Sequence, residues 1–146
     1  MVYAPGRNFL LVVGILYIIF GALNLIGSAV GLASAGFWDT TLPTANDMPW
    51  RVYYTFFLAG SLFQIFIGII AVVNYTRLER AYLLRWLGSV SIFNRILRIM
   101  FASAVFPGGI INFTAFVTFF GLALPILLII GAHKNLNSYR SVSLHM

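Results

Sequence analysis

The chain has 146 residues, of which 61% are hydrophobic and 8% are charged, and its mean hydropathy is +0.96. A soluble domain is about 45–50% apolar and about 25% charged, so this composition excludes a water-soluble globule. The net charge of +6 points to membrane orientation and anionic headgroups rather than to nucleic acid, because the chain has no extended polar face. The absence of cysteine excludes disulfides, thiolate metal sites and thiol catalysis.

Long apolar segments follow one another along the chain. A spanning helix needs about 20 mostly apolar residues to cross about 30 Å of hydrocarbon. No charge occurs from residue 8 to residue 36 or between Arg51 and Arg77, and a third uncharged stretch, from residue 99 to 133, is broken by Pro107-Gly108-Gly109. The sequence therefore predicts an all-α, four-transmembrane-helix bundle. It forms a single integral membrane domain over residues 1–146, with spans at about 9–35, 52–75, 82–106 and 110–132.

The charges between the predicted spans indicate how the bundle is oriented. The N-terminal segment, the 76–85 loop and the C-terminal tail together hold six Lys and Arg residues, whereas the opposite side holds Arg51 with Asp39 and Asp47. The positive-inside rule then places the N- and C-termini in the cytoplasm. We expect the protein to lie in the plasma (inner) membrane. Anionic lipid headgroups are expected to contact Arg77, Arg80 and Arg85.

Two alternatives to this topology follow from the same residues. Ala33-Ser34-Ala35 fits a signal-peptide cleavage site, but the preceding apolar run is about twice a signal core of 7–15 residues, so we expect the first helix to be retained. Residues 77–98 could also lie flat on the cytoplasmic surface as an amphipathic helix, which would leave three spans. The basic C-terminal tail favours four spans.

Small residues on the first predicted helix indicate close packing against a neighbouring helix. Gly14, Gly21, Ser28 and Ala35 recur every seven residues. The pair Gly27-x-x-x-Gly31 fits either a dimer seam or packing inside one bundle, and such pairs are common enough in membrane helices to favour the second. A homo-oligomer that packs through this pair is the alternative.

The third predicted span carries two arginines that do not suit a lipid-facing helix. Its midpoint is residue 94, so Arg95 lies at the centre of the bilayer and Arg98 lies nearer the outer face. An arginine at that depth costs about 2.5–3.5 kcal/mol. Because all three acidic residues of the chain lie outside the spans, an anionic ligand, a lipid headgroup, water, backbone carbonyls or another subunit must compensate these charges.

The other predicted spans also place a polar group near their midpoints. The side chains of Asn24 and Gln64 lie at about the depth of Arg95, and Pro125 leaves the carbonyl of Gly121 without a helical donor. Ordinary interhelical hydrogen bonds would also explain Asn24 and Gln64, and Arg98 could instead extend to the outer headgroups. The pattern predicts a midplane polar pocket whose ligand-binding residues are Asn24, Gln64, Ser91, Asn94, Arg95 and Arg98.

Groups for catalysis are missing from the predicted spans, which hold no Asp, Glu, His, Lys or Cys. We therefore expect no metal site, no cofactor and no proton-coupled transport like that of small four-helix multidrug exporters, which use an acid in the first helix. The leading hypothesis is non-enzymatic: the chain binds, and possibly passes, an anionic or amphiphilic, lipid-like ligand. The alternative is an accessory subunit whose arginines pair with acids of a partner subunit.

A third possibility comes from overall layout. A four-span chain of this length with arginines in its third helix resembles the glutathione-using eicosanoid and microsomal transferase family. That resemblance implies a membrane-embedded lipid-modifying or glutathione-transferase-like enzyme. The second helix of this chain begins Arg51-Val52-Tyr53-Tyr54-Thr55 and lacks the Asn and Glu that the family places there for glutathione. The resemblance therefore covers the layout alone.

Overall fold

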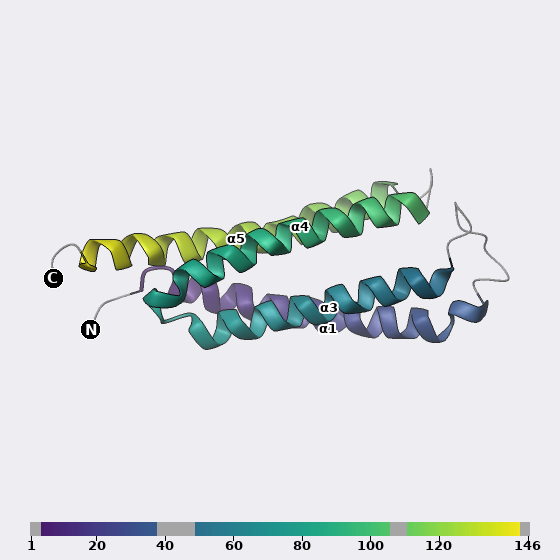
Figure 1. The fold of residues 1–146 in the computed structure, drawn as a ribbon, viewed down its shortest axis with the longest axis horizontal. Helices are drawn as coiled ribbons and strands as arrows, with labels where there is room; N and C mark the ends of the chain where they lie inside the picture. The colour runs from purple at the N-terminus through teal and green to yellow at the C-terminus, as the bar shows by residue number, and fades with distance from the viewer. Residues whose placement is uncertain (1–3, 38–48, 106–110, 144–146) are drawn as a thin grey trace.

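The computed structural model describes residues 4–37, 49–105 and 111–143, with the side chains of 4–37, 49–102, 121–139 and 141. The chain is all-α, as predicted. The described part contains four long helices and one 3₁₀ helix, η2, between α3 and α4 (Figure 1). Their bounds are α1 Arg7–Ala33, α3 Trp50–Asn74, η2 Leu78–Arg80, α4 Ala81–Val105 and α5 Ile111–Ser143.

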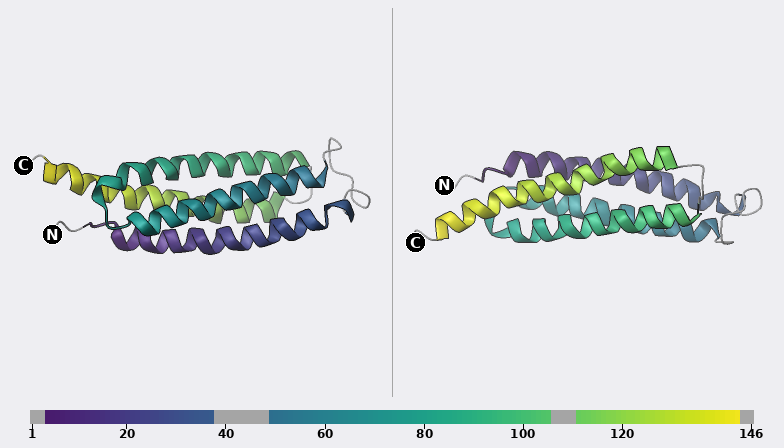
Figure 2. Two further views of the ribbon diagram at one scale, coloured as in Figure 1. Left: turned by 60° about the horizontal axis from the view of Figure 1, so that its bottom comes forward. Right: turned by 90° about the horizontal axis from the view of Figure 1, so that it is seen from above.

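The four long helices form two antiparallel pairs. α1 lies along α3, and α4 lies along α5, whereas the contact between α3 and α4 is much smaller than either (Figures 1 and 2). Both ends of the chain lie at the end of the bundle that holds η2, which we call the η2 end. α3 begins at the opposite end, which we call the Trp50 end.

The first three long helices begin and end within two residues of the predicted ranges, but α5 does not end at residue 132. It continues to Ser143, although the sequence becomes polar after Ala132. Asn135 explains the difference, because its side chain is fully buried and holds this part of α5 against the rest of the bundle. Its Oδ1 accepts a hydrogen bond of 2.7 Å from the Gly6 amide, and its Nδ2 donates to the Tyr75 carbonyl at 3.5 Å. The predicted turn at 107–109 and most of the 36–50 loop lie outside the described residues.

Glycines bring the backbones of α1 and α3 together. A Cβ added at Gly68 would lie 2.7 Å from the Gly14 carbonyl oxygen and 2.9 Å from the Ile18 amide nitrogen. Gly21 packs on the backbone of Ile65 in the same way, at 3.1 Å from its nitrogen. Gly14 and Gly21, two members of the predicted seven-residue stripe, therefore form an interface with α3. Gly27, in contrast, has no atom within 4 Å of such a Cβ and takes no part in it.

Among the described side chains, the main cluster of buried apolar residues lies in the half of the bundle nearest the η2 end, and all four long helices contribute to it. Its buried members are Leu10, Val13, Tyr17, Ile67, Ala71, Leu84, Leu87, Leu124, Leu128 and Ala132.

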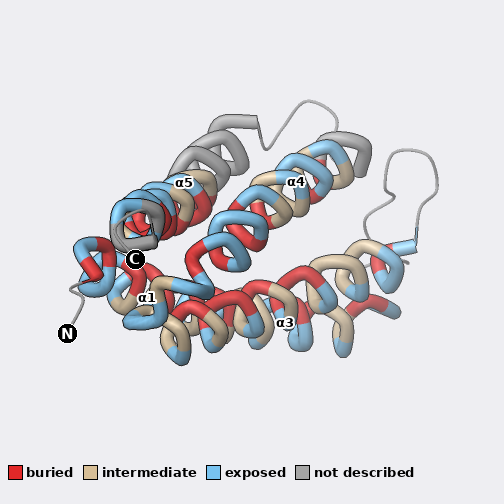
Figure 3. The backbone as a smooth tube through the Cα atoms, turned by 60° about the vertical axis from the view of Figure 1, so that its left-hand side comes forward, coloured by how far each residue is buried: buried red, intermediate tan, exposed pale blue. Residues whose placement is uncertain are grey.

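The outward faces of the helices are apolar as well. Large hydrophobic side chains are exposed on each of the four long helices, and Figure 3 shows exposed residues along their outer sides. Among the described residues, two helices, α1 and α3, are long and apolar enough to cross a membrane. Only 28% and 33% of their most apolar windows are buried, unlike the mostly buried core helix of a soluble protein. The polar side chains Ser28, Ser61, Gln64, Ser91, Arg98 and Asn135 are buried instead.

The α1–α3 contact predicts that two glycine substitutions will differ sharply. Gly68→Ala places a methyl group against the backbone of α1 and should lower the free energy of unfolding by about 1–3 kcal/mol. The matched control Gly27→Ala adds the same methyl group in open space, where the higher helix propensity of alanine should leave stability unchanged or slightly raised. Denaturant titration in detergent, followed by circular dichroism, measures both. Equal stability of the two variants would contradict the backbone contact.

Candidate functional site

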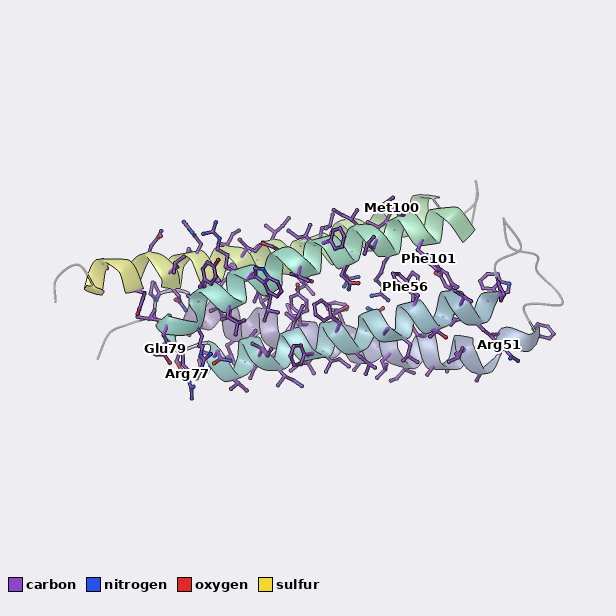
Figure 4. The ribbon with its side chains drawn as sticks, in the orientation of Figure 1. Arg51, Phe56, Arg77, Glu79, Met100 and Phe101 are labelled. Atoms are coloured by element: carbon purple, nitrogen blue, oxygen red, sulfur yellow. The ribbon has the colours of Figure 1, made fainter. Side chains whose placement is uncertain are left out.

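Arg95 and Arg98 face the inside of the bundle. The outer face of α4 is taken by large apolar side chains, of which Phe93 is 60% exposed and Met100 is 64% exposed, and Met100 points away from α3 in Figure 4. Arg95 and Arg98 each lie two residues from one of these exposed side chains, and therefore on the opposite face of the helix. They point toward the other helices. Arg98 is only 6% exposed, and Arg95 is half-buried.

Arg98 lies in a niche on α3. Its Nη2 donates to the carbonyl oxygen of Phe57 at 3.2 Å and to Oγ of Ser61 at 3.5 Å. The guanidinium carbon lies 4.4 Å from the centre of the Phe57 ring, within the range of a cation–π contact. The side chain lies against Gly60, because a Cβ there would be 3.4 Å from both Cδ and Nε of Arg98, at ordinary contact distance.

Arg95 connects the other three helices. Its Nη2 donates to Oε1 of Gln64 on α3 at 2.9 Å, and Nδ2 of Asn24 on α1 reaches the same oxygen at 3.5 Å. On α5, a Cβ added at Gly121 would lie 3.1 Å from Nη1 of Arg95. The guanidinium therefore occupies the space that a side chain at Gly121 would fill. Gly121 therefore lies beside Arg95, whose hydrogen bond within the described residues is to Gln64.

The cluster around the two arginines has more donors than acceptors. Nε2 of Gln64 and Nε of Arg98 are buried without a hydrogen-bond partner. Each buried donor left unsatisfied costs about 1–3 kcal/mol. The single carboxylate of the described ranges, Glu79, lies at the η2 end in Figure 4 and contacts neither arginine. Within the described part of the chain, the two positive charges therefore lack a negative partner.

The structure places the remaining predicted site residues differently. Ser91 is buried, and its Oγ forms a hydrogen bond of 2.9 Å with the hydroxyl of Tyr17 on the η2 side of Arg95. Asn94 is half-buried. Hydrogen bonds thus link Asn24, Gln64 and Arg95, while Arg98 lies on α3 one turn farther along α4 and Ser91 lies one turn before Arg95.

Sequence reasoning missed Tyr17, Ser61 and the Phe57 carbonyl. Tyr17 lies three residues after Gly14 and four before Gly21, so its position on the packed face of α1 could have been predicted from the sequence. Ser61 adjoins Gly60, and its hydroxyl also donates to the Phe57 carbonyl at 2.7 Å, as serines in membrane helices commonly do. The acceptor at Phe57 carries no signal in the sequence, because every residue has a backbone carbonyl.

Aromatic rings close the space between α3 and α4 on the Trp50 side of Arg98. Phe101 lies 4.7 Å from Phe56 and 6.2 Å from Tyr53, measured between ring centres, and Figure 4 shows Phe56 and Phe101 pointing toward one another. Tyr53 in turn contacts Phe57 at 4.4 Å, beneath the guanidinium of Arg98. The arginine site therefore has an aromatic border on this side.

Comparison of the chain with family models, with curated proteins and with solved structures found no match. The proposed function therefore rests on the geometry of the site.

The buried Tyr17–Ser91 hydrogen bond predicts a measurable coupling. Tyr17→Phe leaves the serine hydroxyl without its partner, and Ser91→Ala leaves the tyrosine hydroxyl without one, so each should reduce stability. The double variant removes both polar groups and should lose less than the sum of the single losses, by about 0.6–1.7 kcal/mol. A double-mutant cycle from unfolding titrations in detergent measures this coupling. Strict additivity would show that the bond contributes nothing.

Proposed function

We propose that this chain is an integral membrane protein with four spans and both termini in the cytoplasm, which binds an anionic, amphiphilic ligand between its two helix pairs. The observation that carries the proposal is the pair of inward-facing guanidinium groups of Arg95 and Arg98, which lie among surplus hydrogen-bond donors. No cofactor or metal is needed for this function.

The distribution of polar and apolar side chains supports four spans. Helices α1 and α3 meet the length and composition of membrane spans. Helix α4 exposes Trp86, Phe93 and Met100 while burying its arginine side, an arrangement that suits lipid outside and polar contacts inside. Because α4 lies along α5 rather than across the end of the bundle, its packing favours a crossing helix over one lying flat on the surface.

The charges at the two ends support the orientation. Exposed basic residues gather at the η2 end, whereas Arg51 lies at the Trp50 end, as Figure 4 illustrates for Arg77 and Arg51. By the positive-inside rule the η2 end faces the cytoplasm, and there anionic headgroups would contact Arg77, Arg80 and Arg85.

An anion with several oxygen acceptors is the chemical complement of the site. Nε of Arg98 and Nε2 of Gln64 lack acceptors, and Arg95 uses one of its five N–H donors within the described residues. A carboxylate or phosphate would supply both the acceptors and the missing negative charge. In this proposal Arg95 and Arg98 neutralise the ligand, and Gln64, held by Asn24, orients it.

The accessory-subunit alternative is less well supported. An acid on the helix of another subunit would need to reach the arginines from outside the bundle. Arg98 is buried on α3 of its own chain, and Arg95 packs on Gly121 of α5. A single headgroup needs a much narrower opening between the helix pairs than a helix of another subunit would need.

The orientation predicts which end of the bundle can be labelled from outside a cell. The chain has no cysteine, so single substitutions provide unique labelling sites. Arg51→Cys should react with a membrane-impermeant maleimide in intact cells, and Arg80→Cys should react only after the membrane is opened. Labelling of Arg80→Cys in intact cells would reverse the orientation, and labelling of both variants would exclude four spans.

The ligand proposal predicts a bound anion that depends on the buried arginines. Native mass spectrometry of the mildly extracted wild type should reveal a discrete anionic adduct. Arg95→Gln or Arg98→Gln should reduce adduct occupancy at least tenfold, which corresponds to about 1.4 kcal/mol of binding free energy. The control Lys134→Gln removes an exposed cation at the η2 end, far from the two buried arginines, and should keep the adduct.

Circular dichroism and gel filtration of the same samples separate loss of binding from loss of fold. Wild-type protein without an adduct, or equal occupancy in wild type and both buried-arginine variants, would contradict the proposed function.

A further inference from the structure

We infer that the ligand is a membrane lipid with an anionic headgroup that reaches Arg95 and Arg98 sideways between α3 and α4, from the leaflet at the Trp50 end. The inference rests on the proposed function and deepens it in two respects. It names the chemical class of the ligand, and it makes the site one-sided, so that the ligand binds without passing to the η2 side.

The apolar core closes the site toward the η2 end. The buried residues of the core occupy α1 from Leu10 to Tyr17 and α4 from Leu84 to Leu87, on the η2 side of Arg95. The hydrogen bond between Tyr17 and Ser91 joins α1 to α4 directly beneath the arginine site. An anion moving from Arg95 toward the η2 end would have to leave its donors for this apolar packing, at a large desolvation cost.

The contact between α3 and α4 is the weak seam of the bundle. Glycine-mediated backbone contact joins α1 to α3, and Gly88 packs α4 closely on α5, because a Cβ there would lie 3.3 Å from the Pro125 carbonyl oxygen. On the Trp50 side of Arg98, α3 and α4 meet through the rings of Phe56 and Phe101. No hydrogen bond holds the ring of Phe56 to the ring of Phe101, so these two rings can separate while Arg98 keeps its own hydrogen bonds to α3. Their separation would open a path from the lipid to Arg98.

The surroundings of this seam suit an acyl chain. Phe101 lies one turn beyond Arg98 on α4, and Leu97, on the same side of the helix as Phe101, is 38% exposed. A headgroup at the arginines would therefore leave its acyl chains against Phe56, Leu97 and Phe101. A free anion would have to cross the same apolar border without its hydration shell.

Two cysteines at the seam test the route. The chain has no native cysteine, so Phe56→Cys combined with Phe101→Cys can be linked by a short bis-maleimide after purification. Phosphatidylglycerol added to the linked, delipidated protein should bind at least tenfold less than to the unlinked double variant. Phosphatidylglycerol added before linking should instead stay bound through detergent washes. The two single-cysteine variants, treated with the same reagent, control for modification of the rings.

Three probes test the ligand class in the same native mass spectra. Phosphatidylglycerol should bind, whereas phosphatidylcholine, whose headgroup carries no net charge, and inorganic phosphate should each bind at least tenfold less. Equal binding of phosphatidylcholine would overturn the anionic headgroup, and tight binding of inorganic phosphate would overturn the lipid.

Failure of the inference and failure of the proposed function give different results. Phosphatidylglycerol bound equally to linked and unlinked protein, and lost from Arg95→Gln, would overturn the lateral route alone. Absence of every anionic adduct from wild type would overturn the proposed function as well.

Discussion

The burial of two guanidinium groups inside an apolar bundle is the constraint on which the arrangement of the helices depends. α4 can expose Phe93 and Met100 only by turning Arg95 and Arg98 toward the other helices. Those helices must then provide acceptors as well as space. They do so with the Gln64 side chain, the Phe57 carbonyl and the close approach of Arg95 to Gly121.

The described side chains pack differently toward the two ends of the bundle. Where no long polar side chain intervenes, glycines bring α1 against α3 at Gly14 and Gly68, and the leucine core fills the half nearest the η2 end. Toward the Trp50 end, α4 contacts α3 through the two arginines and through the rings of Phe56 and Phe101. The proposed one-sided ligand site depends on this difference between the two ends.

The helical ranges and the inward position of the arginines could be predicted because each follows from local rules. Apolar runs bounded by charges or by a Pro-Gly-Gly turn set the helix positions, and charges are expected to avoid lipid. The end of α5 could not be predicted in this way, because the helix continues on account of Asn135, whose partners Gly6 and Tyr75 are remote in sequence. The roles of Ser91 and Asn94 were also undetermined, because residues of similar depth face different neighbours.

By itself the sequence determined the all-α class, the number and positions of the long helices and the charge difference between the two ends, since hydropathy and charge are properties of each segment alone. Tertiary structure decided which polar groups meet. Only the packing of four helices pairs Arg95 with Gln64 and Asn24, places Arg98 on the Phe57 carbonyl and directs Ser91 to Tyr17. These contacts depend on how each helix is rotated about its axis, and that rotation is set by side-chain fit between helices, which no single segment encodes.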